Sequence, residues 1–298
     1  CAEEIKKRTA DKMKIAIIEG DNIIDKINEY IDSGVSFNNT DNGKSIEEIK
    51  DSICSANIYI DSFVVAEALK DQPHIVLGGR ITDPGLIVGP CIYEFGWKKE
   101  EYQKLAAATV AGHIIECGAQ CTGGNYSRWW ENDDFTNIGY PIISIDEDGL
   151  FDVYKNNNTG GLVNKLTVTE QLLYEMGNPK EYLSPDVTVD FTSIKLNDNK
   201  NGIVSVCDVK GGSPTDTFKV AVNYVSGYKA NGNLTVTAPY AIQKGKKISE
   251  IILDRLKRKG VEFDEHRVDF VGYNSCSAET LKVDNNPNEL TVSISVKD

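Results

Sequence analysis

Short apolar runs alternate with amphipathic stretches along the first part of the chain, and this alternation restricts the fold more than any other feature. We expect, in chain order, a strand at 14–19, a helix at 21–31, a strand at 54–60, a helix at 63–69 and a strand at 74–79. Parallel strands need crossover connections, which are usually helices. The order therefore predicts an α/β domain with a parallel, Rossmann-like sheet over residues 1–138.

The chain begins at Cys1 without an initiator Met, and an amphipathic stretch follows it immediately. That stretch has the pattern of the last turns of a helix. We therefore expect that a longer protein has been trimmed, and that the missing N-terminal residues complete the first domain.

Strand-like segments follow one another in the second half instead of alternating with helices. We expect a hairpin at 142–154 that turns at Asp148-Gly149, further strands at 187–196, 203–209, 218–237 and 268–271, and a helix at 242–259. Runs of strands beside a helix are typical of α+β domains. Residues 139–298 are therefore predicted to form an α+β domain with a mainly antiparallel sheet, and a length of 298 residues favours two domains.

Charge and composition exclude several classes of partner. A net charge of −13 argues against nucleic acid, because phosphate binding needs clustered Lys and Arg. The sequence holds neither a signal-peptide pattern nor an apolar run of about 18 residues, so no membrane partner is expected. Seven cysteines, an odd number without the spacing of a disulfide framework, predict a reducing cytoplasm.

Reactive side chains are concentrated between residues 113 and 124. His113, Cys117 and Cys121 follow one another at four-residue spacing, which on a straight helix spreads them over about 12 Å. That distance is too long for three short side chains to bind one zinc ion, unless Gly118 ends the helix and bends Cys121 back. A Cys–His nucleophile lacks a third group that orients the imidazole. We therefore expect no metal; the alternative for Cys117 and His113 is packing and a hydrogen bond to a backbone carbonyl.

Glu116 is the strongest catalytic candidate in this stretch. It lies between Ile115 and Cys117 in a helix otherwise rich in Ala, Val and Ile, where an unpaired carboxylate is costly to bury. Glu116 would then pair with a cation, for which Arg80 is a candidate, or act as a general acid–base group with His113 assisting. The alternative is that Glu116 simply faces solvent.

A second candidate lies at the end of the strand at 74–79. Ligands collect beyond the carboxyl ends of strands in open α/β sheets, and Arg80 there can clamp a carboxylate or a phosphate. We expect Asp83 to cap the next helix, with Pro84 at its first position. The segment is neither a dinucleotide-binding fingerprint nor a P-loop, so it predicts no nucleotide. The alternative is a sharp turn in which Arg80 forms a structural ion pair.

Two Thr-Gly-Gly turns could position a ligand. The first consists of Thr122, Gly123 and Gly124, and the second of Thr159, Gly160 and Gly161. We expect a helix after the second turn, with Thr167 and Glu170 as its capping box. Plain loops are the alternative for both turns. The Trp129-Trp130 pair is either a lid over an apolar ligand or an element of packing.

Together these segments resemble the acyclic terpene utilisation family (AtuA-like proteins). The resemblance extends in order over nearly the whole chain and includes Gly-Arg-Ile-Thr-Asp at 79–83, Glu-Cys-Gly-Ala-Gln at 116–120, Thr-Gly-Gly at 122–124 and 159–161, and further stretches at 55–57, 93–97, 105–113, 137–141, 169–175, 190–192 and 219–220. Cys121 is not part of the family pattern. The resemblance implies a bacterial cytosolic protein of acyclic terpene or branched acyl breakdown, and it assigns no catalytic residues.

Two functions therefore remain open. One is an enzyme that acts on a small branched acid, free or as a CoA thioester, by hydration, dehydration or another acid–base step. In such an enzyme Glu116 moves a proton and His113 assists. Arg80 anchors an anion, and Asp83 and the two Thr-Gly-Gly turns position the ligand. The sequence requires no cofactor. The alternative is a non-catalytic subunit that binds a ligand or a partner in a homo- or hetero-oligomer.

Overall fold

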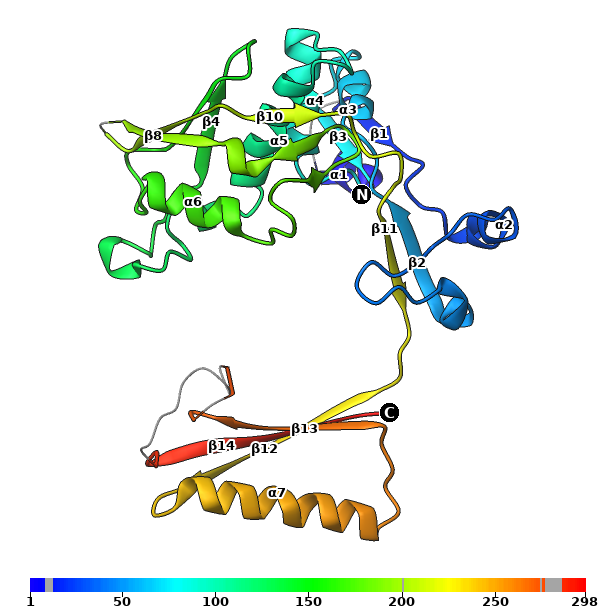
Figure 1. The fold of residues 1–298 in the computed structure, drawn as a ribbon, viewed down its shortest axis with the longest axis vertical. Helices are drawn as coiled ribbons and strands as arrows, with labels where there is room; N and C mark the ends of the chain where they lie inside the picture. Colours follow the sequence, from blue (N-terminus) through cyan, green and yellow to red (C-terminus); the bar gives the residue numbers. More distant parts are fainter. Residues whose placement is uncertain (9–12, 200, 274, 277–285) are drawn as a thin grey trace. The chain divides into compact units, whose positions relative to one another are not determined.

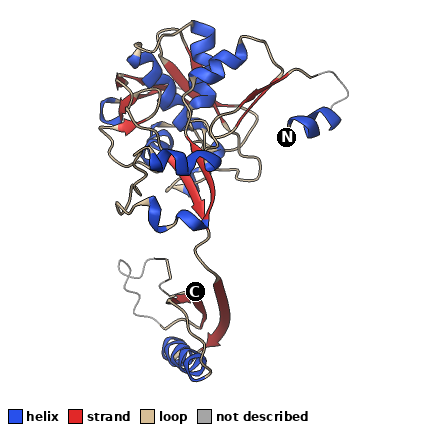
Figure 2. Cartoon of the chain, turned by 90° about the vertical axis from the view of Figure 1, so that its right-hand side faces the viewer, coloured by secondary structure: helices blue, strands red, loops and turns tan. Residues whose placement is uncertain are grey.

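The computed structural model describes residues 1–8, 13–199, 201–273, 275–276 and 286–298, which belong to two compact units (Figure 1, Figure 2). The first unit runs from Cys1 to Tyr224 and the second from Val225 to Asp298. This division differs from the expected boundary after residue 138, which lies inside the first unit. The reason is that helix α5 (Tyr102–Ile115) packs against elements from both sides of that residue.

The elements of the first unit are short. Its α-helices are α1 (Ala2–Arg8), α2 (Ile27–Asp32), α3 (Phe63–Leu69), α4 (Gly85–Phe95), α5 (Tyr102–Ile115) and α6 (Lys165–Leu173). Its strands are β1 (Ile15–Ile18), β2 (Ile53–Ile58), β3 (Ile75–Gly78), β4 (Pro141–Ile145), β5 (Phe151–Lys155), β6 (Tyr182–Leu183), β7 (Thr188–Asp190), β8 (Lys195–Asn199), β9 (Ile203–Cys207), β10 (Lys210–Gly212) and β11 (Val220–Tyr224). Single 3₁₀ turns lie at Ile24–Lys26, Ile46–Glu48, Lys50–Ser52, Gly118–Gln120, Trp129–Glu131 and Phe191–Ser193. Across the part of the chain that the structure describes, no helix is both long and apolar enough to cross a membrane.

The expected parallel sheet is reduced to one pair of strands within the described residues. β1 and β3 are parallel, with Ile15 opposite Ile75. β2 does not join them and pairs antiparallel with β11, where Val220 lies opposite Ile58. This partner lies far along the chain, so the local pattern of β2 could not identify it. The fold is mixed α/β with one parallel pair and several small antiparallel sheets, and the Rossmann-like prediction is not confirmed.

The part of the first unit after residue 138 is antiparallel, as expected, but in separate sheets. β4 and β5 form the predicted hairpin, which turns at Gly149 with φ +84°. It continues into a sheet of order β4-β5-β9-β8, and β10, β7 and β6 form a second sheet. α5 packs against β4 of the first sheet and against β7 and β10 of the second.

Helix α5 is the centre of the first unit, and every residue from Leu105 to Ile114 is buried. Small side chains, mostly alanines, make up much of this stretch and let the neighbouring elements approach closely. The closest approach is to the start of α4: a Cβ on Gly112 would lie 2.6 Å from the Cα of Pro84. Only glycine fits there, and the contact brings the residue before Pro84 close to the end of α5.

The second unit consists of a three-stranded antiparallel sheet and one helix (Figure 1). Its elements are β12 (Lys229–Thr237), α7 (Ala241–Arg258), β13 (Glu265–Val271) and β14 (Glu289–Lys297). Alternate residues of β14, including Leu290, Val292 and Ile294, are buried in a core with apolar residues of α7. The helix predicted at 242–259 and the strand at 268–271 are confirmed. The strand-like run at 218–237 is divided between β11 and β12, which belong to different units.

Asp186, in the loop between β6 and β7, ties that loop to the start of α3. Its carboxylate accepts hydrogen bonds from the backbone N–H of Ser62, at 2.7 Å, and from the Ser62 hydroxyl, at 2.5 Å. Both residues are buried. Burial disfavours the charged form and raises the pKa of Asp186 to about 6, although the two hydrogen bonds oppose this shift.

This raised pKa predicts a loss of stability as the pH rises. An unfolded Asp has a pKa of about 3.9, so between about pH 4 and pH 6 the folded chain holds a proton that the unfolded chain releases. The contribution of Asp186 is complete below about pH 4 and is lost as the pH rises through about 6. Asp186→Asn removes this dependence. As the pH rises from 4 to 7, the free energy of unfolding of the wild type should therefore fall by about 2–3 kcal/mol relative to that of the variant. Urea unfolding measures the difference; a constant difference over this range would contradict the prediction.

Candidate functional site

An open cleft of about 510 Å³ lies where the start of α4, the end of α5 and the end of α6 meet. Its lining residues are Asp83, Leu86, Ile87, Gly112, Ile115, Glu116, Cys117, Tyr174 and Glu175. The walls are therefore largely apolar, with three carboxylates and no Lys or Arg among them. Ligand clefts commonly combine apolar walls with a few polar groups.

His113 and Glu116 form a close pair between the core and the cleft. Nδ1 of His113 lies 3.1 Å from Oε1 of Glu116, but the contact lacks the alignment of a hydrogen bond. The His113 side chain is 3% exposed and the Glu116 side chain 21% exposed. Glu116 thus reaches the cleft while His113 lies behind it. Arg80, the candidate cation for Glu116, pairs with Asp83 instead, and the described partner of Glu116 is His113.

The other side of the imidazole fixes its tautomer. Nε2 of His113 lies 3.1 Å from the backbone carbonyl of Gln171, which can only accept a hydrogen bond, so Nε2 carries a proton. Nδ1, on the other side of the ring, faces Glu116. A close approach of Nδ1 to a carboxylate oxygen is favourable only when one of the two atoms carries a proton. The pair can therefore hold one mobile proton.

Several groups hold His113 in place. The side-chain amide of Gln171, on α6, donates a hydrogen bond of 2.9 Å to the backbone carbonyl of His113. The aromatic rings of Tyr182 and Phe191 lie edge-on to the imidazole, with centroid distances of 5.8 and 5.5 Å. The two rings and the Gln171 carbonyl thus surround the imidazole on several sides. The sequence alternative of a hydrogen bond from His113 to a backbone carbonyl is confirmed, and it coexists with the Glu116 contact.

The cysteines of this region are poorly suited to act as nucleophiles. Burial raises the pKa of Cys121 to about 12. Burial also raises the pKa of Cys117, and the carboxylates of Glu116, Glu175 and Asp83 add to the effect. A thiolate is the nucleophile and metal ligand, so the raised pKa values disfavour both roles for these two cysteines. Over the described ranges, no group of three or more His, Cys, Asp or Glu side chains is placed to hold a metal ion.

Arg80 and Asp83 lie beside the cleft and are paired with each other. Nη1 of Arg80 is 3.2 Å from Oδ1 of Asp83, and the guanidinium lies 4.8 Å from the ring centroid of Tyr59. Nζ of Lys219 lies 4.9 Å from the same centroid. Asp83 lines the cleft and Arg80 does not, so the ion pair holds Arg80 at the edge of the cleft. The expectation that Asp83 caps α4 is wrong, because the helix begins at Gly85 after Pro84 and Arg80 holds the Asp83 carboxylate.

The two Thr-Gly-Gly turns contact each other outside the lining of the cleft. The backbone N–H of Leu162 donates a 2.8 Å hydrogen bond to the carbonyl of Thr122, and the N–H of Gly161 donates to Oδ1 of Asn132. Gly123 and Gly161 have φ of +94° and +93°, which L side chains rarely adopt. Gly124, Thr159 and Gly160 belong to the same pair of loops. Nδ2 of Asn132, buried beside Gly123, has no hydrogen-bond partner.

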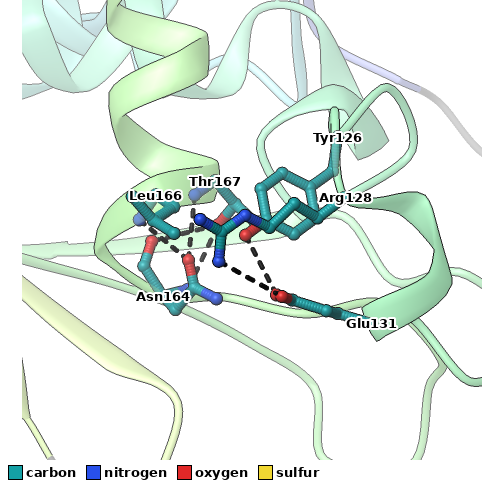
Figure 3. Close-up of polar contacts among 6 residues, drawn as sticks. All are labelled: Tyr126, Arg128, Glu131, Asn164, Leu166 and Thr167. Atoms are coloured by element: carbon teal, nitrogen blue, oxygen red, sulfur yellow. Dashed lines mark hydrogen bonds and ion pairs between the residues drawn. The ribbon is translucent and has the colours of Figure 1, made fainter.

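The loop that carries the Trp pair lies beside the start of α6, and Figure 3 shows the polar contacts within each of the two segments. The Tyr126 hydroxyl and the Arg128 guanidinium both reach the carboxylate of Glu131. Trp129 and Trp130 are more than half exposed. The capping box of α6 is formed by Asn164 and Thr167, so the expected box of Thr167 and Glu170 is wrong by one turn. The Glu170 carboxylate instead accepts a hydrogen bond from the backbone N–H of Ser127.

Tyr174 and Glu175 are site residues that reasoning from the sequence missed. They follow α6 directly, and both line the cleft. Glu175 has φ +53°, a conformation that costs a non-glycine residue free energy and that glycine normally takes after a helix. A glutamate after a helix is ordinary in a sequence, so no signal there marked Glu175. Glu175 raises the pKa of the Tyr174 hydroxyl, mainly by hydrogen bonding.

These features define a mixed α/β protein with one acidic, apolar-walled cleft backed by a buried histidine. The family model described as "Acyclic terpene utilisation family protein AtuA" matches residues 1–298. The chain therefore belongs to this family, and its role lies in the utilisation of acyclic terpenes. No curated protein and no solved structure matches the chain.

The geometry at His113 predicts its tautomer. In the folded protein the neutral imidazole should carry its proton on Nε2, because the Gln171 carbonyl accepts a hydrogen bond from Nε2. Nitrogen-15 NMR of the imidazoles measures both atoms, and His113→Gln identifies the signal among the three histidines. A neutral form with the proton on Nδ1 and a bare Nε2 would contradict this assignment.

Proposed function

We propose that this protein is an enzyme of acyclic terpene or branched acyl breakdown, and that it transfers a proton in a hydration or dehydration step. Glu116 exchanges the proton with the substrate, and His113 supplies or stores it. The observation that carries the proposal is the contact between Nδ1 of His113 and Oε1 of Glu116, with Glu116 opening into the cleft. A positioned general acid–base group contributes about 10²–10⁴-fold to a rate.

The walls of the cleft support an apolar substrate. Leu86, Ile87 and Ile115 offer aliphatic surface beside Glu116, and the Leu86 side chain is exposed without a ligand. A branched hydrocarbon chain would cover this surface and exclude water from the acid–base pair. Desolvation of this kind strengthens every electrostatic interaction within a site.

The anionic end of a substrate, a free carboxylate or a CoA thioester, would lie outside the cleft. The carboxylates of Asp83, Glu116 and Glu175 would repel a negative charge inside it. Arg80 pairs with Asp83 at the edge of the cleft, and Lys219 lies near the same Tyr59 ring as Arg80, so these two cations are the candidates to hold that end. The Thr-Gly-Gly turns act in this proposal as supports for the loops around the site, and their contact with a ligand stays a prediction.

A second candidate is a subunit that binds a partner chain, as a homo- or hetero-oligomer. The observation that favours it is a set of exposed aromatic side chains in one loop region: Trp129, Trp130, Phe135 and Tyr140 are each 45–70% exposed. Aromatic residues are enriched in protein interfaces. A cytoplasmic location belongs to both proposals, and it is supported by seven free cysteines.

The enzymatic proposal is tested with acyclic branched alcohols and with unsaturated branched acids, free and as CoA thioesters. Mass spectrometry detects the gain or loss of one water and the incorporation of solvent deuterium. Glu116→Gln keeps the shape of the side chain and should lower the rate at least about 100-fold. Glu94→Gln, on the exposed face of α4, is the matched control and should retain the wild-type rate. Equal rates for the two variants would contradict the role of Glu116.

A further inference from the structure

The second unit has a long free strand at one edge of its sheet. β12 pairs with β14 over its whole length, and no strand among the described residues pairs with its outer edge. A free edge exposes unpaired N–H and C=O groups, and proteins usually protect it with charged side chains, Pro, a bulge or a short strand. Apart from Lys229 at its first position, β12 has none of these. Its outer edge is therefore open to pairing with another strand.

The opposite edge of the same sheet is protected. β13 carries the charged residues Glu265, Arg267 and Asp269 along a shorter strand. Nε of Arg267 lies 2.8 Å from Oδ2 of Asp269, so these two charges are also held in place. Edge charges of this kind prevent the addition of a further strand. The two edges therefore differ, and only β12 is suited to pairing.

Gly232, in the middle of β12, is not explained by its own chain. Its φ is not positive, and the register of the strand with β14 is unbroken around it. A Cβ at this position would meet no atom of the described residues within 4 Å. Glycine inside a strand weakens it and often marks a bulge, a bend or the close approach of another backbone. The approach of a second chain is the explanation that fits these observations.

A second copy of β12 fits this edge in the antiparallel register that pairs the whole strand. That register is centred on Asn233, which lies opposite its own copy. Leu234 and Val236 pack in the core that α7 covers, so the even-numbered residues of β12 face this core. On that face Gly232 lies opposite Leu234 of the copy, and Ala230 lies opposite Val236. Each large side chain therefore meets a small one.

The other face of the same register is polar. Asn231 lies opposite Thr235, and Lys229 lies opposite Thr237. Amide and hydroxyl side chains stabilise such cross-strand pairs, whereas like charges directly opposite each other destabilise them. The two copies of Lys229 lie at opposite ends of the paired strands, so they do not repel each other closely. The strand is therefore complementary to itself on both faces.

Helix α7 places an exposed apolar side chain on the side of β12. Nζ of Lys244 donates a 2.9 Å hydrogen bond to the carbonyl of Thr237, at the end of β12. Ile251 lies two helical turns after Lys244, on the same side of the helix, and it is 46% exposed. A copy of the sheet added at β12 brings its own α7 to this side, where Ile251 has a surface to pack against.

We propose that β12 is the interface of a homodimer, in which two copies of this chain pair antiparallel along the strand and join their sheets into one. Both α7 helices then lie on the same face of the joined sheet, and Gly232 accommodates the partner's Leu234. The arrangement is isologous, as in most two-fold dimers, and the backbone ladder supplies its affinity. The inference concerns the second unit, and it depends neither on the acid–base proposal nor on the aromatic loop at 129–140.

Sedimentation velocity of the full chain over a range of concentrations tests the proposal and should show a monomer–dimer equilibrium. Asn233→Asp places two carboxylates opposite each other at the centre of the pair, and should lower the dimer affinity at least about tenfold. Asn233→Lys should have the same effect. An equimolar mixture of the two variants should recover the dimer, because each carboxylate then faces an ammonium group. This recovery is expected only if residue 233 lies opposite its own copy.

Two further variants separate the interface from the fold. His266→Asp adds the same charge at the exposed edge formed by β13, and should leave the dimer affinity unchanged. Gly232→Val occupies open space in one chain and favours a strand, so the monomer should keep or raise its melting temperature. The same valine collides with the partner's Leu234, and should lower the dimer affinity at least about tenfold.

Three outcomes overturn the inference. The first is a monomer at every concentration, and the second is a dimer that Asn233→Asp leaves intact. The third is a dimer that is lost only when Trp129 and Trp130 are replaced by Ser, which would locate the contact in the aromatic loop.

The result is independent of the proposed enzymatic function. If the dimer behaves as expected but no alcohol or acyl compound is converted, this inference stands and the enzymatic proposal fails. If a protein that is monomeric throughout loses its turnover in Glu116→Gln, the enzymatic proposal stands and this inference fails.

Discussion

The contact between Gly112 and Pro84 is the constraint on which the rest of the site depends. A Cβ on residue 112 would lie 2.6 Å from the Cα of Pro84 and 2.8 Å from its carbonyl oxygen, so α5 can meet the start of α4 at this distance only through glycine. Because the two backbones touch, Asp83 lies on one side of the cleft and Glu116, one helical turn beyond Gly112, lies on the other. The small side chains of α5 also let strands of two sheets pack against it.

The third wall of the cleft depends on a hydrogen-bonded connection between α5 and α6. Gln171 donates from its side chain to the carbonyl of His113 and accepts from the His113 ring at its own carbonyl, so one residue sets both the position of the helix and the tautomer of the imidazole. It also sets the place where α6 ends, and therefore where Tyr174 and Glu175 project. The cleft thus depends on how α4 and α6 meet α5. These two contacts bring together the acid–base pair, the apolar walls and Glu175.

Local patterns in the sequence predicted several local elements, among them the hairpin at Gly149 and the helix α7. Glu116 was also singled out from its neighbours; it lines the cleft, and its catalytic role stays a prediction. Some predictions failed because they depended on distant partners: β2 pairs with β11, and Arg80 does not reach Glu116. The predicted caps of α4 and α6 failed locally, because each helix begins at a different residue than expected. Glu175 was missed because a glutamate after a helix is ordinary in sequence, and only its positive φ and its place in the cleft distinguish it.

The central claim is that Asp83, Glu116 and Glu175 converge on one cleft, and the ionisation of Cys117 tests it most directly. Each carboxylate raises the pKa of this partly exposed thiol, after the larger effect of burial. The rate of alkylation of Cys117 as a function of pH, resolved from the other cysteines by mass spectrometry, measures that pKa. Asp83→Asn, Glu116→Gln and Glu175→Gln should each lower it, while Glu94→Gln should not. An unchanged pKa in all three variants would contradict the convergence.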